Sequence, residues 1–236
     1  MQPCYPCDLE EALRGARPGL ELHWAGIAGL SVGRVNRYLR EQAVGLPLID
    51  GPSRALSGCL LAERGRGYLL YDAVAEGCEQ RWTKALLLAR FLEAHHRPRV
   101  RALELLGEPI RPVLDGVRPA TRAEQIHAVM SSIRLENLDV LIAYPHEPPT
   151  SSAGLETERR IERIALELLA PAALLRQRLC GFQPRVGGLS RHDWLARLLC
   201  DAFGLPAMVA RNRAHNVIGD QGDTTLLDWL QANINR

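Results

Sequence analysis

The sequence predicts an α+β fold, and three observations support this prediction. Two short apolar runs, residues 55–62 and 68–72, flank Glu63-Arg-Gly-Arg-Gly67, which is typical of a β-hairpin because its glycines can adopt positive φ. The apolar side chains of residues 80–95 wrap most of a helical circumference, which indicates a buried helix. Amphipathic helical periodicity returns in the C-terminal part of the chain. These patterns favour a small antiparallel sheet packed against helices and followed by a helical module.

The composition is that of an ordinary globular protein. The 236 residues are 47% hydrophobic and 24% charged, which is enough for one sizeable core and a smaller module. A net charge of +2 gives no argument for a nucleic-acid or membrane protein. The N-terminal segment lacks the basic and apolar regions of a signal peptide, and no apolar run approaches the ~20 residues that cross a bilayer. We therefore expect a cytoplasmic protein that does not act on membranes.

Two helices are predicted before the hairpin, at residues 8–16 and 31–43. The second has apolar side chains at three- and four-residue intervals, at Val32, Val35, Tyr38 and Leu39. Ser31 is expected to cap this helix, because a serine oxygen can accept from the free N–H groups of a first turn.

The helix that follows the hairpin is expected to end at two histidines. His95 and His96 precede Arg97-Pro98, and a proline disfavours the helical conformation in the residue before it. Imidazoles at a helix C-terminus can bond the last carbonyls and interact favourably with the helix dipole. We therefore expect both histidines to cap this helix and not to bind a metal.

A long insertion, residues 97–155, separates this central helix from the next long helix at residues 156–169. Thr121 and Glu124 form a capping-box pattern at the start of one helix of the insertion. The predicted elements of the insertion are helices at 100–106 and 122–132, an extended Pro- and Gly-rich path at 107–119, and a strand at 138–144. So large an insertion could cover a groove or offer a new surface.

The chain is expected to divide into a first domain, residues 1–172, and a C-terminal helical module, residues 173–236. Pro171 stands at the boundary, where it ends one helix or opens the next. The signals within the module are a cap at Ser190 and Asp193, a helix to Phe203, a C′ glycine at Gly204, and a second helix from Pro206 to about His215.

The central helix carries a motif that is similar to an enzyme active site. Arg81-Trp-Thr-Lys-Ala-Leu-Leu-Leu-Ala-Arg-Phe-Leu92 resembles the R-F-T-x-A-H-E-x-x-H-x-L segment of the ImmA/IrrE family of zinc metallopeptidases. Leu86, Leu87 and Arg90 stand where that family has its first histidine, its glutamate and its second histidine. The resemblance implies a zincin-like peptidase domain with a degenerate H-E-x-x-H motif.

Two further segments extend the resemblance to about residues 27–215. Residues 158–171, which end in Leu-Leu-Ala-Pro, match the family's second helix, and Glu158 stands at the position of the third zinc ligand. Residues 198–213 resemble the LA-x-x-F-G-V-S-x-x-A-x-x-x-R-L tail of many members, which is a small module similar to a helix-turn-helix. Active members of the family use zinc to cut a helix-turn-helix repressor and so relieve the repression of stress responses or of mobile elements.

The substitutions in the motif remove the ligands that zinc chemistry needs. In an H-E-x-x-H helix two imidazoles converge on Zn²⁺ while the glutamate activates a bound water. Leu86 and Leu87 offer no lone pairs, and the single carboxylate of Glu158 cannot hold zinc. We therefore expect no catalytic residue, no metal and no cofactor, and we predict that an Arg90–Glu158 ion pair stands in place of the metal. The alternative is that both groups are separate, solvated surface charges.

Other candidate ligands give weaker signals. Cys4 and Cys7 form a C-x-x-C pair that could clamp a metal or act as a redox couple. A structural zinc site needs four ligands and the chain has no second such pair, so reduced thiols are the favoured interpretation.

The function that we predict is the binding of a protein partner by a non-catalytic peptidase-like protein. A transcriptional regulator is the expected class of partner, and an extended segment of it could add to the strands by β-augmentation. One alternative is an active zinc endopeptidase with unorthodox ligands drawn from His95, His96, Glu158 or the insertion. Another is a DNA-binding regulator that uses Arg211 and Arg213, although the module that carries them could simply pack on the first domain. The identity of the partner and the oligomeric state stay open.

Overall fold

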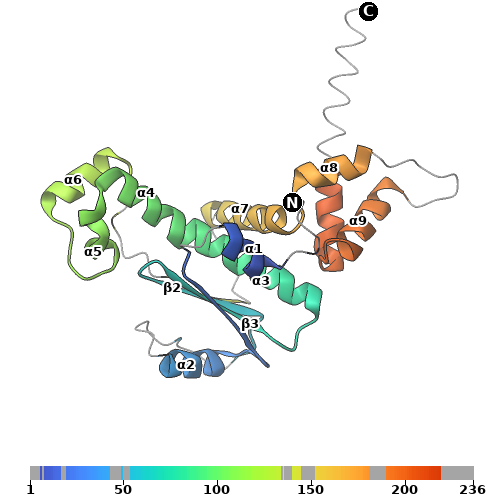
Figure 1. Cartoon of the computed structure of the whole chain (residues 1–236), viewed down its shortest axis with the longest axis horizontal. Helices are drawn as coiled ribbons and strands as arrows, with labels where there is room; N and C mark the ends of the chain where they lie inside the picture. The colour runs from blue at the N-terminus through green and yellow to red at the C-terminus, as the bar shows by residue number, and fades with distance from the viewer. Residues whose placement is uncertain are drawn as a thin grey trace, which may run out of the picture.

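A computed structural model of the chain describes residues 6, 8–16, 20–42, 49, 54–133, 135, 140–144, 152–180 and 190–218. They form a four-stranded sheet with helices on both faces, so the predicted α+β class is confirmed (Figure 1). None of the described helices combines the length and the apolar character that a membrane crossing needs. In chain order the elements are α1 (Leu9–Ala16), β1 (Leu22–Ile27), α2 (Val32–Glu41), β2 (Gly58–Glu63), β3 (Arg66–Asp72), α3 (Gly77–Phe91), the π-helical turn η1 (Leu92–His96), α4 (Arg97–Leu106), the 3₁₀ turn η2 (Glu108–Ile110), α5 (Arg111–Leu114), α6 (Arg122–Met130), β4 (Val140–Tyr144), α7 (Ser152–Leu169), α8 (Ala172–Cys180), α9 (Arg191–Asp201) and a last helix at residues 207–218.

The sheet is mixed, which corrects the expectation of a purely antiparallel one. Its strand order is β1-β3-β2-β4, and β2 runs antiparallel to both of its neighbours. Strand β1, which the sequence patterns did not predict, runs parallel to β3 and pairs Leu22 with Gly67. Parallel strands need a crossover connection between them, and here α2 and β2 lie in that connection.

The predicted hairpin is confirmed and has the expected turn chemistry. Strands β2 and β3 pair from Glu63 and Arg66 outward. The two turn residues, Arg64 and Gly65, both have positive φ, at 48° and 88°. Positive φ at both central residues is the conformation that matches the twist of an antiparallel pair. The glycine at the second position makes this turn accessible.

Both faces of the sheet are covered, because alternate residues of a strand point to opposite sides. One face carries Cys59, Leu61 and Leu70, which pack against α2 residues such as Val32, Val35 and Leu39. The other face carries Leu60, Ala62 and Leu69, which pack against Leu87, Leu88 and Phe91 of α3. A strand enclosed on both sides has to be apolar along its whole length, and β2 is buried except at its last residue.

Helix α2 begins without the side-chain cap that we expected at Ser31. The Ser31 side chain makes no capping hydrogen bond. Its backbone instead forms an isolated bridge with Ala55, and its carbonyl accepts from Val35 N–H at 2.9 Å. The start of the helix is therefore held by the chain segment that leads into β2.

The central helix does not end at His95 and His96, which corrects that expectation. After α3 the chain makes the π-helical turn η1, in which Arg97 N–H bonds to the carbonyl of Leu92, and continues directly into α4. Pro98 lies in the first turn of α4, where a missing N–H costs little. The wide turn lets the helix pass the proline, so the two histidines lie inside a continuous helix and have no terminus to cap.

The insertion begins with a compact helical unit and not with an extended path. Gly107 ends α4 at a φ of 79°, and the prolines that follow lie in the first turns of η2 and α5. Val117 N–H then bonds back to the Pro112 carbonyl at 2.8 Å. The prolines therefore start short helices because each occupies a position whose N–H needs no partner. The unit has a small core of its own, built on Ala102, Ile110, Val113 and Leu114.

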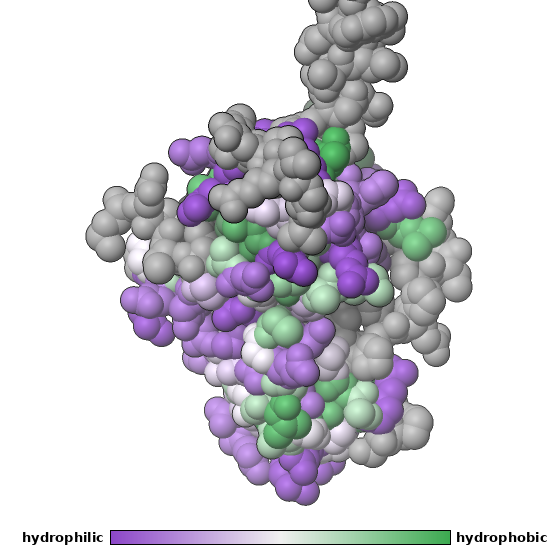
Figure 2. Space-filling model, turned by 90° about the vertical axis from the view of Figure 1, so that its right-hand side faces the viewer, coloured by the Kyte–Doolittle hydropathy of each residue, from purple (hydrophilic) through white to green (hydrophobic). Residues whose placement is uncertain are grey.

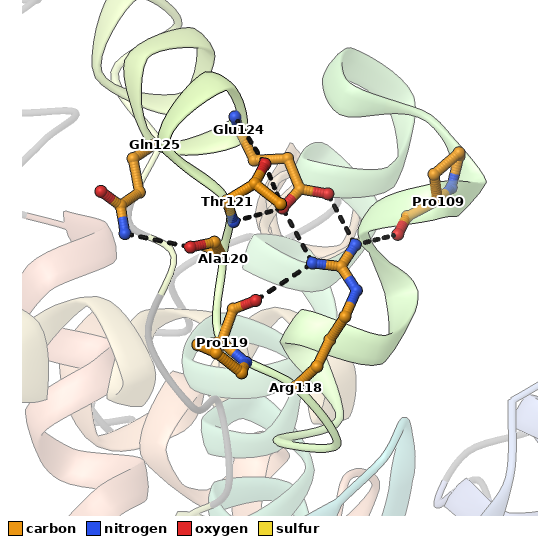
Figure 3. A network of polar contacts seen from close by, with 7 residues as sticks. All are labelled: Pro109, Arg118, Pro119, Ala120, Thr121, Glu124 and Gln125. Carbon is orange, nitrogen blue, oxygen red and sulfur yellow. Dashed lines mark hydrogen bonds and ion pairs between the residues drawn. The ribbon is translucent and has the colours of Figure 1, made fainter.

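Helix α6 starts with the predicted capping box, and an arginine reinforces it (Figure 3). Glu124 N–H donates to the Thr121 hydroxyl, while Thr121 N–H donates to the Glu124 carboxylate at 2.7 Å. Arg118 binds both oxygens of the same carboxylate, at 2.6 and 2.9 Å, and also donates to the Pro109 carbonyl. The Arg118 hydrogen bonds, followed by that from Thr121, lower the pKa of Glu124 to about 2.

The C-terminal helices share one core with α3 and α7. Ser190 caps α9 through Asp193 N–H at 3.1 Å, and Gly204 has a φ of 65° after the helix end, as the sequence predicted. The last helix follows at residues 207–218. The buried residues of this core come from α1, α3, α7, α8, α9 and the last helix, and include Leu9, Ala85, Ala89, Ile161, Ala165, Leu175, Leu195, Leu199, Phe203, Ala210 and Ala214. The alternative in which the module packs on the first domain is therefore what the contacts show.

Candidate functional site

The structure brings Arg90 of α3 and Glu158 of α7 together. The Arg90 Nη2 donates to both carboxylate oxygens of Glu158. The side chain of Arg90 is 9% exposed and that of Glu158 is 22% exposed, so the pair lies between the two helices and not on the open surface. This geometry does not fit the alternative of two separate solvated charges.

The faces of α3 and α7 that meet beside this contact are apolar. Ala85 and Ala89 of α3 and Ile161 and Ala165 of α7 are buried in the same core. Glu158 is three residues before Ile161, so it lies on the α7 face that packs on α3. The ion pair therefore follows directly from the way in which the two helix faces meet.

The two leucines of the motif are packing residues. Leu87 is completely buried and packs with Leu60 and Ala62 of the sheet. Leu86 is partly buried and packs against the core that α3 shares with the C-terminal helices. Both leucine side chains lie in apolar surroundings. At neither position does another polar residue replace the histidine or the glutamate of the family motif.

The residues present do not fit a zinc ion. Arg90 puts a permanent cation where a ligand would have to be neutral, and it already binds both oxygens of Glu158. Within the described ranges, no three His, Cys, Asp or Glu side chains gather in a way that could hold a metal. Cys4 and Cys7 lie outside the described residues.

A second ion pair, Arg160 with Glu93, links α7 to the turn η1 that follows α3, and the sequence reasoning missed it. Glu93, in the π turn, accepts from Arg160 of α7 at 2.9 Å and from Arg97 at 3.2 Å. Burial alone would raise the pKa of Glu93, but the hydrogen bonds from the two arginines outweigh burial and lower it. The four-residue spacing of Glu93 and Arg97 was a signal for one of these bonds, whereas only the fold brings Arg160 to the site.

His95 is committed to the hairpin turn. It is 1% exposed, and its Nε2 accepts from Gly65 N–H at 3.0 Å. Its ring lies against Phe91, with 5.4 Å between centroids. The buried Arg99 lies beside the same turn and pairs with Asp115, with Nη2 and Oδ1 2.7 Å apart. The turn between β2 and β3 is thus fixed to the long helix and to the insertion.

A pocket lies between α1 and the start of α3. Its volume is about 410 Å³, and Asp8, Gly77, Gln80, Arg81 and Lys84 are among the residues that line it. Both cations are already engaged: Arg81 donates to the Gly204 carbonyl and Lys84 binds Glu10 at 2.9 Å. Lys84 also lies 4.3 Å from the centre of the Tyr71 ring. These contacts tie α1, the sheet and the C-terminal helices to α3.

The two arginines suggested for nucleic-acid contact differ in their surroundings. Arg213 is bound to Glu167 of α7, and its side chain is only 11% exposed. Arg211 is exposed and lines a shallow pocket with Asp193, Arg197 and Cys200. The side of the molecule that faces the viewer in Figure 2 is largely hydrophilic, with apolar residues in small separate groups. Of the two, only Arg211 is free to approach another molecule.

Comparisons with protein-family models, with curated proteins and with solved structures found no match. The likeness to the ImmA/IrrE metallopeptidases therefore rests on the two helix motifs and on the tail segment, and the α+β class of the fold is what the coordinates themselves establish.

Proposed function

We propose that this chain is a non-catalytic, peptidase-like protein that acts by binding a protein partner. The observation that carries the proposal is the ion pair in which Arg90 Nη2 donates to both carboxylate oxygens of Glu158. It joins the two helices between which the family resemblance implies a zinc ion. A peptidase of this kind needs a metal-bound hydroxide as its nucleophile, and the residues at these positions do not form a site that could generate one.

The ion pair links the two helices, as the zinc ion that it would replace does. A carboxylate left alone between two packed helices would be strongly destabilising, and a planar guanidinium satisfies both of its oxygens at once. Leu86 and Leu87 meanwhile contribute apolar packing where polar ligands would need partners. These contacts support a peptidase-like scaffold that works as a binding module without the zinc chemistry.

Zinc content tests the non-catalytic part of the proposal. We expect purified wild-type protein to contain no stoichiometric zinc by elemental analysis. The triple variant Leu86→His, Leu87→Glu and Arg90→His should take up about one zinc ion per chain, because its two histidines and Glu158 restore the three protein ligands of a catalytic zinc site, with water as the fourth ligand. Adding Glu158→Gln to that variant is the matched control and should lower the uptake.

Two results would argue against this part. Tightly bound zinc in the wild-type protein would favour the active endopeptidase, with ligands outside those we describe. A triple variant that folds with a native circular-dichroism spectrum but takes up no zinc would show that the scaffold is not of the zincin type.

The partner class comes from the resemblance. Active family members recognise a helix-turn-helix repressor, so we propose that this chain binds a transcriptional regulator in stress response or in the control of mobile elements. The alternative of direct DNA binding depends on Arg211 and Arg213, and Glu167 already holds the second of these. If DNA were the ligand, Arg211→Ala would weaken duplex binding and reduce its salt dependence; under our proposal the wild-type chain shows no such salt-dependent duplex affinity.

A further inference from the structure

Helix α6 of the insertion carries large apolar side chains that stay exposed. Ile126, Val129 and Met130 are 54%, 76% and 81% exposed. Ala123, one turn before Ile126, is exposed as well. Residues three and four positions apart lie on the same face of a helix, so these four side chains form one apolar stripe along α6. A single exposed aliphatic residue is ordinary, whereas a contiguous group on one helix face is typical of a surface that binds another protein.

The stripe is the side of α6 that faces away from the rest of the insertion. The inward side carries the buried Ala128 and also Glu124, which binds Arg118. At about 100° per residue, both of these lie on the opposite side of the helix from Ile126. Helix α6 itself lies at one end of the molecule, with the C-terminal helices at the other (Figure 1). The stripe is therefore open to a second molecule.

One charge beside the stripe indicates which partner fits it. Three arginines of the insertion are paired with carboxylates of the same insertion: Arg99 with Asp115, Arg111 with Glu108, and Arg118 with Glu124. The guanidinium of Arg122, in the first turn of α6, has no such partner among the described residues. Arg122 lies four residues before Ile126 and seven before Val129, so it stands on the face that carries the stripe.

The partial charge that would complement Arg122 is present at the other end of the same helix. The carbonyl end of a helix is partially negative and stabilises a nearby cation. If two copies of α6 pack antiparallel through their stripes, Arg122 of each lies beside the C-terminal turn of the other. The small Ala123 of one copy then faces the large Met130 of the other, and Ile126 lies near the centre of the contact. Both halves of a complementary contact are thus on one helix, which favours a second copy of this chain as the partner.

We infer that this protein self-associates through α6, with the apolar stripes of two copies packed antiparallel across a two-fold axis. Such a contact uses the same surface on both copies and closes as a dimer. Helix α6 has nine residues, so the contact is short. It belongs with the reversible interfaces that bury less than about 1,200 Å², for which a dissociation constant of about 10–100 µM is expected. The surface is separate from the Arg90–Glu158 pair, and the inference does not depend on the proposed function.

Sedimentation velocity of the full chain at about 5 to 500 µM tests the association. We expect the wild type to show a reversible monomer–dimer equilibrium. Met130→Glu would bury a charge in the contact and should weaken dimerisation at least about tenfold. Met208→Glu is the matched control, because Met208 is 67% exposed on the last helix, and it should leave dimerisation unchanged. A wild type that stays monomeric at the highest concentration would overturn the inference and leave the stripe to a different partner. A dimer that Met130→Glu weakens no more than Met208→Glu does would also overturn it.

Charge reversal tests the antiparallel arrangement without weakening α6, and it decides the case in which Met130→Glu does not fold. Arg122→Glu puts an acid in the first turn, where the helix dipole favours it, so α6 of the monomer is not destabilised. In the dimer this acid lies beside the carbonyl end of the other copy, and the dissociation constant should rise about fivefold at low salt. Arg101→Glu, at an exposed position of α4, is the control. If the Arg122→Glu variant dimerises as tightly as the Arg101→Glu variant, the antiparallel pairing is refuted.

Discussion

Breaking the Arg90–Glu158 pair from the acidic side should destabilise the protein measurably. Glu158→Gln keeps the shape of the side chain but removes its charge, so the buried guanidinium of Arg90 loses its ion pair with Glu158. Removing one partner of a fully buried ion pair costs about 3–5 kcal/mol. Here Glu158 is 22% exposed and the glutamine oxygen can still accept one hydrogen bond, so we expect a loss of about 2 kcal/mol.

Urea denaturation followed by circular dichroism measures this loss. With an m-value of about 3 kcal/mol/M, a loss of about 2 kcal/mol moves the midpoint down by roughly 0.7 M. Glu162→Gln is the matched control, because Glu162 is exposed on the same helix, and it should change stability by less than about 0.5 kcal/mol.

A double variant separates the loss of the pair from an effect of the position. Arg90→Leu combined with Glu158→Leu removes both charges together and should restore the stability to within about 1 kcal/mol of wild type, since an apolar pair can replace a buried ion pair. If Glu158→Gln shifts the midpoint no more than Glu162→Gln does, the reasoning that Arg90 depends on Glu158 is refuted.

Three further predictions test other parts of the structure. Leu87→Ala should cost about 3 kcal/mol in the same assay, because Leu87 is fully buried, whereas Leu105→Ala at a half-exposed position should cost much less; equal losses would contradict the packing role of the motif leucines. His95→Phe keeps a ring against Phe91 but leaves Gly65 N–H without its acceptor. A loss of about 1–2 kcal/mol in stability is therefore expected. An unchanged denaturation midpoint would show that the hydrogen bond from Gly65 to His95 does not stabilise the hairpin turn. In an NMR titration the Glu124 carboxyl should titrate at a pH of about 2, because Arg118 lowers its pKa. The contribution of the ionised Glu124 to stability is therefore complete above pH 4.5 and is lost as the pH falls towards 2. Arg118→Ala should raise the pKa of Glu124 towards its ordinary value.

Local sequence signals predicted the elements whose geometry is set within a few residues. The hairpin follows from glycine at a turn that needs positive φ, and the capping box of α6 and the N-cap of α9 follow from Thr121 and Ser190. The Arg90–Glu158 contact could be predicted only by comparing two motifs, far apart in the chain, with those of the family that they resemble.

Long-range contacts decided the features that the sequence did not reveal. Strand β1 owes its existence to parallel pairing with β3, and its own residues, Leu-His-Trp-Ala-Gly-Ile, lack a clear alternation. The sequence predicts a helix end just before Pro98, but the π turn widens the helix at that point and lets it continue. The contact of Arg160 with Glu93 depends on how α7 lies against this turn. The partners of β1 and of Glu93 are far away in the sequence, whereas the π turn lies immediately before Pro98.

The unbroken passage from α3 through η1 into α4 gives the insertion a mechanical role. At about 1.5 Å per residue, α4 carries α5 and α6 roughly 15 Å beyond His96. No flexible loop joins α4 to α3, because backbone hydrogen bonds continue through η1 and Glu93 of η1 binds Arg160 of α7. A force on α5 and α6 would therefore be transmitted through α4 and η1 to α3, which carries Arg90. From α3 it would reach the strands that this helix covers.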